Sequence, residues 1–224
     1  MLNYISASLL FITLFTFSAQ GQDKKKDLPT YPKTRGVAIG VDLSPLILQW
    51  ADPSRQGLNF SGRMNVTENW YVVGECGYEK YEYTSERFNY NSKGLGFKLG
   101  ADYNVFNPHE LNNNDNVLFG FRYGVAQQNH GSSSYTSQNG YWSDYTSSIA
   151  TYGVTSHYFE LLTGLRAEVL KNFFMGVIVR ARSLIYTSNK ELLEPSTIPG
   201  YGKPLPLNFG FSYTLEYQIP LQKK

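Results

Sequence analysis

Strict alternation of apolar and polar residues is the feature of this sequence that most restricts its fold. In the last segment the odd positions from 209 to 221 are apolar or aromatic, and the even positions from 208 to 218 are polar or glycine. A period of two places successive side chains on opposite faces of a β-strand. The segment is longer than the five or six residues of an ordinary strand. One long apolar face of such a strand must be shielded from water.

The same alternation recurs in seven further segments. The eight expected strands lie at 36–48, 57–66, 70–83, 91–105, 115–127, 154–169, 173–186 and 207–221. Short turns are expected on one side of the sheet and long loops, 128–153 and 187–206, on the other, which is the layout of bacterial outer-membrane barrels. We therefore predict an all-β fold: an eight-stranded antiparallel up-and-down transmembrane β-barrel with a polar, charge-filled lumen. A soluble β-sandwich and a lipocalin-like barrel are the alternatives, but a lipocalin interior would be apolar.

The composition agrees with a β-rich chain and argues against several functions. Aromatic residues make up 16% of the 224 residues and charged residues only 17%, below the roughly 25% of a soluble domain. A net charge of +2 offers no electrostatic basis for nucleic-acid binding. The single cysteine, Cys76, excludes an internal disulfide and a cysteine-rich metal site. It falls on the apolar face of its strand.

Charged residues on the polar faces would point into the barrel. Glycines on the same faces would make room for their side chains, because an eight-stranded barrel is just wide enough for side chains to fill it. We expect a lumen charge network of paired ions, which makes a plug rather than an open pore. Its twelve members are Arg63, Glu75, Glu79, Lys98, Asp102, Arg122, Glu160, Arg166, Glu168, Arg180, Arg182 and Glu216.

Aromatic residues near the strand ends fit the girdles of a membrane barrel. At the short-turn ends these are Trp70, Tyr71, Phe173, Phe174 and Phe106, and Trp50 lies at the opposite rim.

The amino terminus indicates export. Residues 9–17 form an apolar run that is too short to cross a bilayer as a helix, and small residues at 19 and 21 fit a cleavage site before Gln22. We expect a cleaved signal peptide at 1–21, a flexible periplasmic segment at 22–35, the outer-membrane β-barrel at 36–222 and a C-terminal tail at 223–224. The expected location is the cell outer membrane.

Several motifs carry a resemblance to a known family. They include Gly40-Val41-Asp42-Leu43-Ser44-Pro45, Gly74-Glu75-Cys76-Gly77-Tyr78-Glu79 and Lys98-Leu99-Gly100-Ala101-Asp102-Tyr103-Asn104. Over about 34–222 the chain resembles an uncharacterised family, a domain of unknown function, of small outer-membrane β-barrel proteins from Bacteroidota. The resemblance implies the fold and the outer membrane of a Gram-negative cell, and no activity.

Candidate chemistry is sparse. The histidines His109, His130 and His157 have no metal-ligand spacing, and we expect no metal and no cofactor. Ser156 and His157 near Glu160 suggest a lipid hydrolase, but neighbouring strand residues point to opposite faces. We therefore expect no enzyme and no catalytic residues.

Segment 128–153 has the Tyr, Ser, Gly and Asn composition of binding loops. Its candidate contact residues are Tyr135, Tyr141, Trp142, Tyr145 and Tyr152. Segment 187–206 is rich in proline, and we expect it to be stiff. The predicted role is a non-enzymatic structural, accessory or surface-interaction protein of the outer membrane, with a narrow channel or a lipid-modifying enzyme as alternatives. Expected partners are outer-membrane lipid, the barrel-assembly machinery during insertion and an outer-membrane protein, but no nucleic acid.

Overall fold

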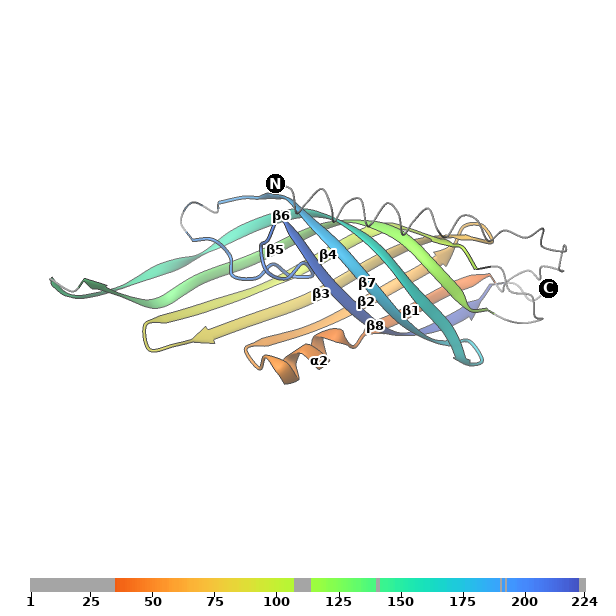
Figure 1. Cartoon of the computed structure of the whole chain (residues 1–224), viewed down its shortest axis with the longest axis horizontal. Coiled ribbons are helices and arrows are strands. Elements are labelled where there is room, and N and C mark those ends of the chain that lie inside the picture. The colour runs from red at the N-terminus through yellow and green to blue at the C-terminus, as the bar shows by residue number, and fades with distance from the viewer. Residues whose placement is uncertain (1–34, 107–113, 140–141, 190, 192, 222–224) are drawn as a thin grey trace, which may run out of the picture. The chain divides into compact units, whose positions relative to one another are not determined.

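A computed structural model describes residues 35–106, 114–139, 142–189, 191 and 193–221 (Figure 1). The expected signal peptide, most of the segment 22–35 and the tail 223–224 lie outside the described residues. The strands are β1 (Gly36–Asp42), β2 (Arg55–Asn65), β3 (Trp70–Thr84), β4 (Phe88–Asn104), β5 (Asn116–Asn139), β6 (Trp142–Leu170), β7 (Phe173–Thr187) and β8 (Leu207–Pro220), and one helix, α2 (Ser44–Ala51), follows β1.

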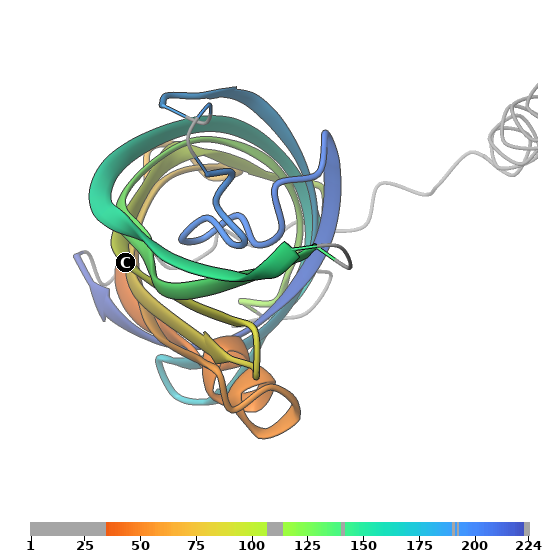
Figure 2. The same ribbon diagram turned by 90° about the vertical axis from the view of Figure 1, so that its left-hand side faces the viewer.

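The eight strands form a closed antiparallel barrel in which each strand pairs with its neighbours in sequence (Figures 1 and 2). The first and last strands close the ring, since Val37 of β1 pairs with Met64 of β2 on one side and with Ile219 of β8 on the other. Closure leaves no sheet edge in the part of the wall where all eight strands pair. The predicted all-β, eight-stranded, up-and-down fold is confirmed.

The two faces of the barrel wall have opposite chemistry. Apolar side chains point outward on all eight strands, and Leu99, Leu165 and Phe209 expose 65%, 61% and 69% of their surface. On the inner face of the same wall, Arg122 and Glu160 are fully buried. A soluble barrel would have the reverse arrangement, because apolar burial drives its folding.

The first strand is shorter than predicted. Our expected strand 36–48 is wrong beyond Asp42, because Ser44–Ala51 forms α2 instead. Pro45 has no N–H for a sheet ladder but fits the first turn of a helix. The Asp42 carboxylate supports the change of direction, since its Oδ1 accepts a hydrogen bond from the Ser44 N–H at 2.9 Å. Among the described residues, no helix is both long enough and apolar enough to cross a membrane.

Segment 128–153 is also not the loop that we predicted. β5 runs on to Asn139 and β6 starts at Trp142, so the segment forms a two-stranded ribbon at one end of the barrel (Figure 1). Its Tyr and Thr residues favour strands. Our pattern analysis missed it because neither face of this ribbon is apolar. We call residues 128–153 the ribbon, and the end of the barrel that carries it the ribbon end.

Two of the predicted girdle aromatics point inward. Tyr71 and Phe174 are buried in the lumen, whereas Trp70 and Trp50 are exposed. At the short-turn end Tyr71 packs with Val73 and Leu118 as a small apolar cluster. The parity of the strands already required this, because Tyr71 and Phe174 follow directly after outward-facing residues.

Candidate functional site

The middle of the lumen holds a compact group of ion pairs contributed by five consecutive strands, β3 to β7. Glu75 accepts hydrogen bonds from Arg180 at 3.0 Å and from Arg122 at 3.3 Å. Glu160, which is fully buried, lies 3.2 Å from the Lys98 ammonium and 2.9 Å from the guanidinium groups of both Arg180 and Arg182. Lys98 also lies 3.3 Å from Glu75, so Glu75 and Glu160 each bind three cations.

The network continues toward the short-turn end. Asp102 joins Arg122, at 2.7 Å, to Arg63, at 2.5 Å. Arg63 in turn lies 3.4 Å from Glu216, which binds Arg166 at 2.7 Å. The Arg166 guanidinium also stacks on the inward-facing Phe174 ring, 3.5 Å from its centroid, which is a favourable cation–π geometry.

Ten of the twelve predicted lumen charges are joined in this one network. Its cations are Arg63, Lys98, Arg122, Arg166, Arg180 and Arg182, and its anions are Glu75, Asp102, Glu160 and Glu216. The six cations therefore exceed the four anions by two. Glu79 pairs instead with Arg55, and Glu168 binds Asn114 and the Asn172 N–H near the short turn.

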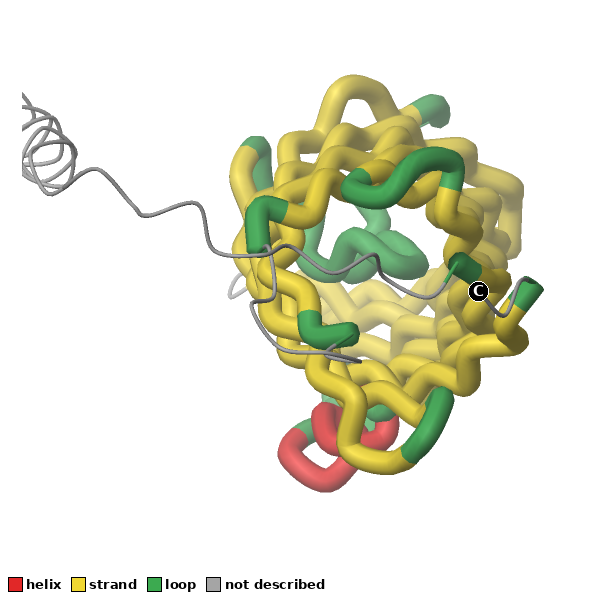
Figure 3. The backbone as a smooth tube through the Cα atoms, turned by 90° about the vertical axis from the view of Figure 1, so that its right-hand side faces the viewer, coloured by secondary structure: helices red, strands yellow, loops and turns green. Residues whose placement is uncertain are grey.

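The segment between β7 and β8 folds back into the mouth of the barrel (Figures 2 and 3). Ile198 and Tyr201 are fully buried there and pack with Tyr158 and Ala126 of the barrel wall. The Tyr201 hydroxyl donates to the Leu205 carbonyl oxygen, and burial raises the pKa of this phenol. We call residues 195–206 the plug. The expected stiffness of this segment is useful here, because a preorganised segment loses little entropy on docking.

Polar contacts fix the plug to the barrel wall. The Arg182 guanidinium donates to the Tyr201 carbonyl oxygen at 3.1 Å. The Thr197 hydroxyl donates to Glu79 at 3.1 Å and accepts from Arg55 at 2.8 Å. Our sequence reasoning missed Arg55, because the predicted second strand began two residues after it. The sequence did offer a signal for this contact, because Arg55 lies just before a predicted strand and Glu79 is a predicted lumen carboxylate that needs a cation.

The structure separates the candidate contact residues of the ribbon. Tyr145 is exposed, with 63% of its surface accessible, and Tyr135 is half-buried. Tyr152 turns toward the segment after β7, and its hydroxyl donates to the Leu193 carbonyl oxygen at 2.7 Å. Tyr141 and the side chain of Trp142 lie outside the described residues.

The residues considered for catalysis point apart. Ser156 is buried in the lumen and bonds Thr187 at 3.2 Å, whereas the His157 ring lies on the outer face and bonds the Tyr123 hydroxyl at 2.8 Å. His130 is buried beside Tyr90, and His109 lies outside the described residues. In the described part of the chain, no three His, Cys, Asp or Glu side chains form a group that could hold a metal ion.

Comparisons with known proteins give structural likenesses at low identity. The chain is similar to Ail, the attachment invasion locus protein of Yersinia pestis, with 10% identity and a TM-score of 0.42, covering 84% of this chain and 99% of Ail. It is also similar to neisserial surface protein A, with 10% identity and a TM-score of 0.40, covering 83% of this chain and 96% of that protein. No curated protein sequence matches the chain. One family, described as a domain of unknown function (DUF6048), matches residues 1–224, and the chain therefore belongs to the DUF6048 family.

Proposed function

We propose that this chain is an outer-membrane β-barrel that acts without catalysis, as a structural or accessory protein that presents an interaction surface outside the membrane. The observation that carries the membrane part is the inverted wall: an apolar outer face on every strand and charged groups inside. A transmembrane strand needs about 9–11 residues, and the outward-facing apolar positions of β4, from 95 to 103, span that length.

The lumen supports a structural role rather than transport. Asp102, Arg122 and Glu160 are fully buried, and the ion pairs Glu75–Arg180 and Lys98–Glu160 join strands that are not neighbours. Moving a solute through would require breaking several of these pairs, and leaving one buried partner alone costs about 3–5 kcal/mol. The plug covers the ribbon end as well.

The ribbon is the surface that would bind a protein partner. β6 pairs with β7 only from Ser156 onward, and the carbonyl oxygens of Thr155 and Gly153 accept hydrogen bonds from Ser188 and Asn189. The described residues of β6 before Gly153 therefore have a strand on the β5 side alone. A free strand edge can bind an extended peptide through backbone hydrogen bonds. The exposed Tyr145 adds aromatic area of the kind found in binding surfaces.

Affinity purification of the tagged protein from outer membranes in mild detergent tests this proposal. The matched control replaces residues 136–146 by Asn-Gly, because Tyr135 pairs with Ser147 and two residues suffice for a tight hairpin. We expect a stoichiometric protein that copurifies with the full chain and not with the shortened one. Recovery of the same proteins with both chains would refute the ribbon's role, and recovery from the soluble fraction would refute the membrane location.

A further inference from the structure

The barrel wall has a gap at the ribbon end between β2 and β8. Among the described residues β1 is the only strand between them, and its pairing ends at Asp42, opposite Asn59 of β2 and Thr214 of β8. β2 continues to Arg55 and β8 to Leu207, each paired only on its far side. Residues 55–58 and 207–212 therefore border an interval in which no strand of the described part of the chain lies.

Helix α2 lies over this gap. The Leu43 N–H donates to the Tyr213 carbonyl oxygen at 2.8 Å, and the Tyr213 N–H donates to the Ser44 hydroxyl at 2.7 Å, where β1 gives way to the helix. On the β2 side the approach is close, since a Cβ on Gly57 would lie 3.3 Å from the Pro45 Cβ. The opposite face of α2 exposes Leu46, Ile47 and Trp50, as in a helix at a membrane interface.

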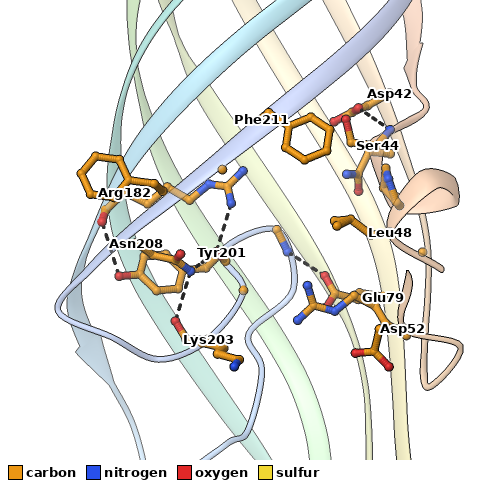
Figure 4. A pocket seen from close by; sticks show the side chains of 18 of the residues that line it. Asp42, Ser44, Leu48, Asp52, Glu79, Arg182, Tyr201, Lys203, Asn208 and Phe211 are labelled. Carbon is orange, nitrogen blue, oxygen red and sulfur yellow. Dashed lines mark hydrogen bonds and ion pairs between the residues drawn. The ribbon is translucent and has the colours of Figure 1, made fainter. Parts of the chain in front are cut away.

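A cavity of about 330 Å³ opens beside α2 (Figure 4). Its lining includes residues from both faces of β8: Phe209 and Phe211 of the outer face, and Asn208 and Gly210 of the inner face. A cavity bounded by both faces of one strand passes around the free edge of that strand. The cavity therefore connects the apolar outer surface with the interior of the barrel, and we call it the portal. Its volume lies at the lower end of the range for small-molecule sites.

The lining of the portal carries four cations, Arg55, Lys98, Arg182 and Lys203, against three carboxylates, Asp42, Asp52 and Glu79. Lys98 and Arg182 line it and belong to the network in which cations exceed anions by two. Lys203 of the plug also lines the portal and is exposed. Within the described part of the chain no ion pair to the Lys203 ammonium is present. The three carboxylates are engaged: Asp42 and Asp52 accept hydrogen bonds from the Ser44 and Ser54 N–H groups, and Glu79 binds Arg55 and Thr197.

We propose that the portal is a binding site for an anionic amphiphile that enters from the lipid side, with its acyl chain against Phe209 and Phe211 and its acidic head group near Lys203 and Arg182. This inference rests on the proposed membrane location. The portal opens outward among exposed apolar side chains, and this position favours a lipid as the occupant. The excess of positive charge selects an acidic head group over a zwitterionic one.

Electron paramagnetic resonance of spin-labelled lipids tests the proposal. The full chain is inserted into phosphatidylcholine vesicles containing either chain-labelled phosphatidic acid or chain-labelled phosphatidylcholine, and the motionally restricted fraction of each is measured. Leu48→Trp should fill the portal, since Leu48 lines it, and Leu46→Trp is the matched control on the exposed face of α2. Lys203→Gln removes one head-group contact and leaves the apolar part unchanged.

For the unaltered chain we expect about a threefold greater restricted fraction for phosphatidic acid than for phosphatidylcholine. L48W should abolish the difference, K203Q should reduce it and L46W should leave it unchanged. Equal fractions for both lipids, or a difference that survives in L48W, would overturn the proposal. Loss of the difference when sodium phosphate replaces sodium chloride at equal ionic strength would show a free-anion site and overturn it too. Failure of the chain to insert into the vesicles would refute the proposed membrane function itself.

Discussion

Replacement of Glu160 by glutamine tests the role of the lumen network most sharply. Glu160 is fully buried and lies within 3.2 Å of Lys98, Arg180 and Arg182. Glutamine has nearly the same shape, so the substitution removes charge and not volume. The network would then hold six cations against three anions. The NH2 group of the new glutamine would also face a guanidinium, and two hydrogen-bond donors cannot bond to each other.

The expected cost follows from the burial of these partners. Removing one member of a buried ion pair costs about 3–5 kcal/mol, because the remaining charge is left without compensation. Arg180 retains Glu75, and Lys98 retains the same carboxylate at 3.3 Å, so we expect the lower part of this range, about 3 kcal/mol. Arg182 loses its carboxylate and keeps the Tyr201 carbonyl oxygen.

Glu168→Gln is the matched control on the same strand. Glu168 accepts hydrogen bonds from the Asn114 amide and the Asn172 N–H, and a glutamine oxygen can accept one of them. We expect a cost of about 1 kcal/mol, that of one hydrogen bond. Urea titrations of both variants in lipid vesicles measure the free energies of unfolding. Equal losses for E160Q and E168Q, or an E160Q variant as stable as the unaltered chain, would refute the reasoning.

Three further substitutions test other parts of the structure. Leu99→Arg, in the middle of the apolar outer face of β4, should lower the free energy of unfolding in vesicles by about 2–4 kcal/mol, whereas Tyr145→Arg on the ribbon should lower it much less. Similar losses for the two variants in urea titrations would contradict a lipid-facing belt. Gly100→Ala should destabilise the barrel by about 1–3 kcal/mol, because its Cβ would overlap the Phe121 carbonyl oxygen, whereas a Cβ at Gly74 would meet nothing within 4 Å. A loss with G74A as large as with G100A would show that packing at Gly100 is not the cause. Tyr201→Ala should free the plug, which limited proteolysis of vesicle-inserted protein would detect as cleavage between 195 and 206; protection as in the unaltered chain would show that Tyr201 does not hold the plug.

The alternation of the sequence carried most information where the wall meets lipid. In β5 it predicts that Phe119, Phe121 and Tyr123 face outward and that Arg122 faces inward, as observed. The pattern carries no information where both faces of a strand meet water, and the ribbon was therefore taken for a loop. Period-two reasoning also overran the start of α2, although Ser44-Pro45 is a helix-start signal.

The partners of individual charges could not be read from the sequence. Parity places Glu79 and Glu168 on the inner face, but height along the barrel decides which cations they reach. That height depends on the stagger of the strands, which closure of the ring fixes. The plug is harder still, because its docking depends on complementarity with Tyr158 and Arg182, residues that lie 16 or more positions before Ile198 in the sequence.

The central claim is that the outer wall of this barrel faces lipid, and the single cysteine offers the most direct measurement. Cys76 lies in β3 and is exposed on the outer face. A charged, membrane-impermeant maleimide should fail to label it in native outer membranes and should label it fully after denaturation in SDS. A cysteine placed at Tyr145 of the ribbon, in a chain with Cys76→Ala, should react in both conditions. Full labelling of Cys76 in the native membrane fraction would contradict the lipid-facing wall.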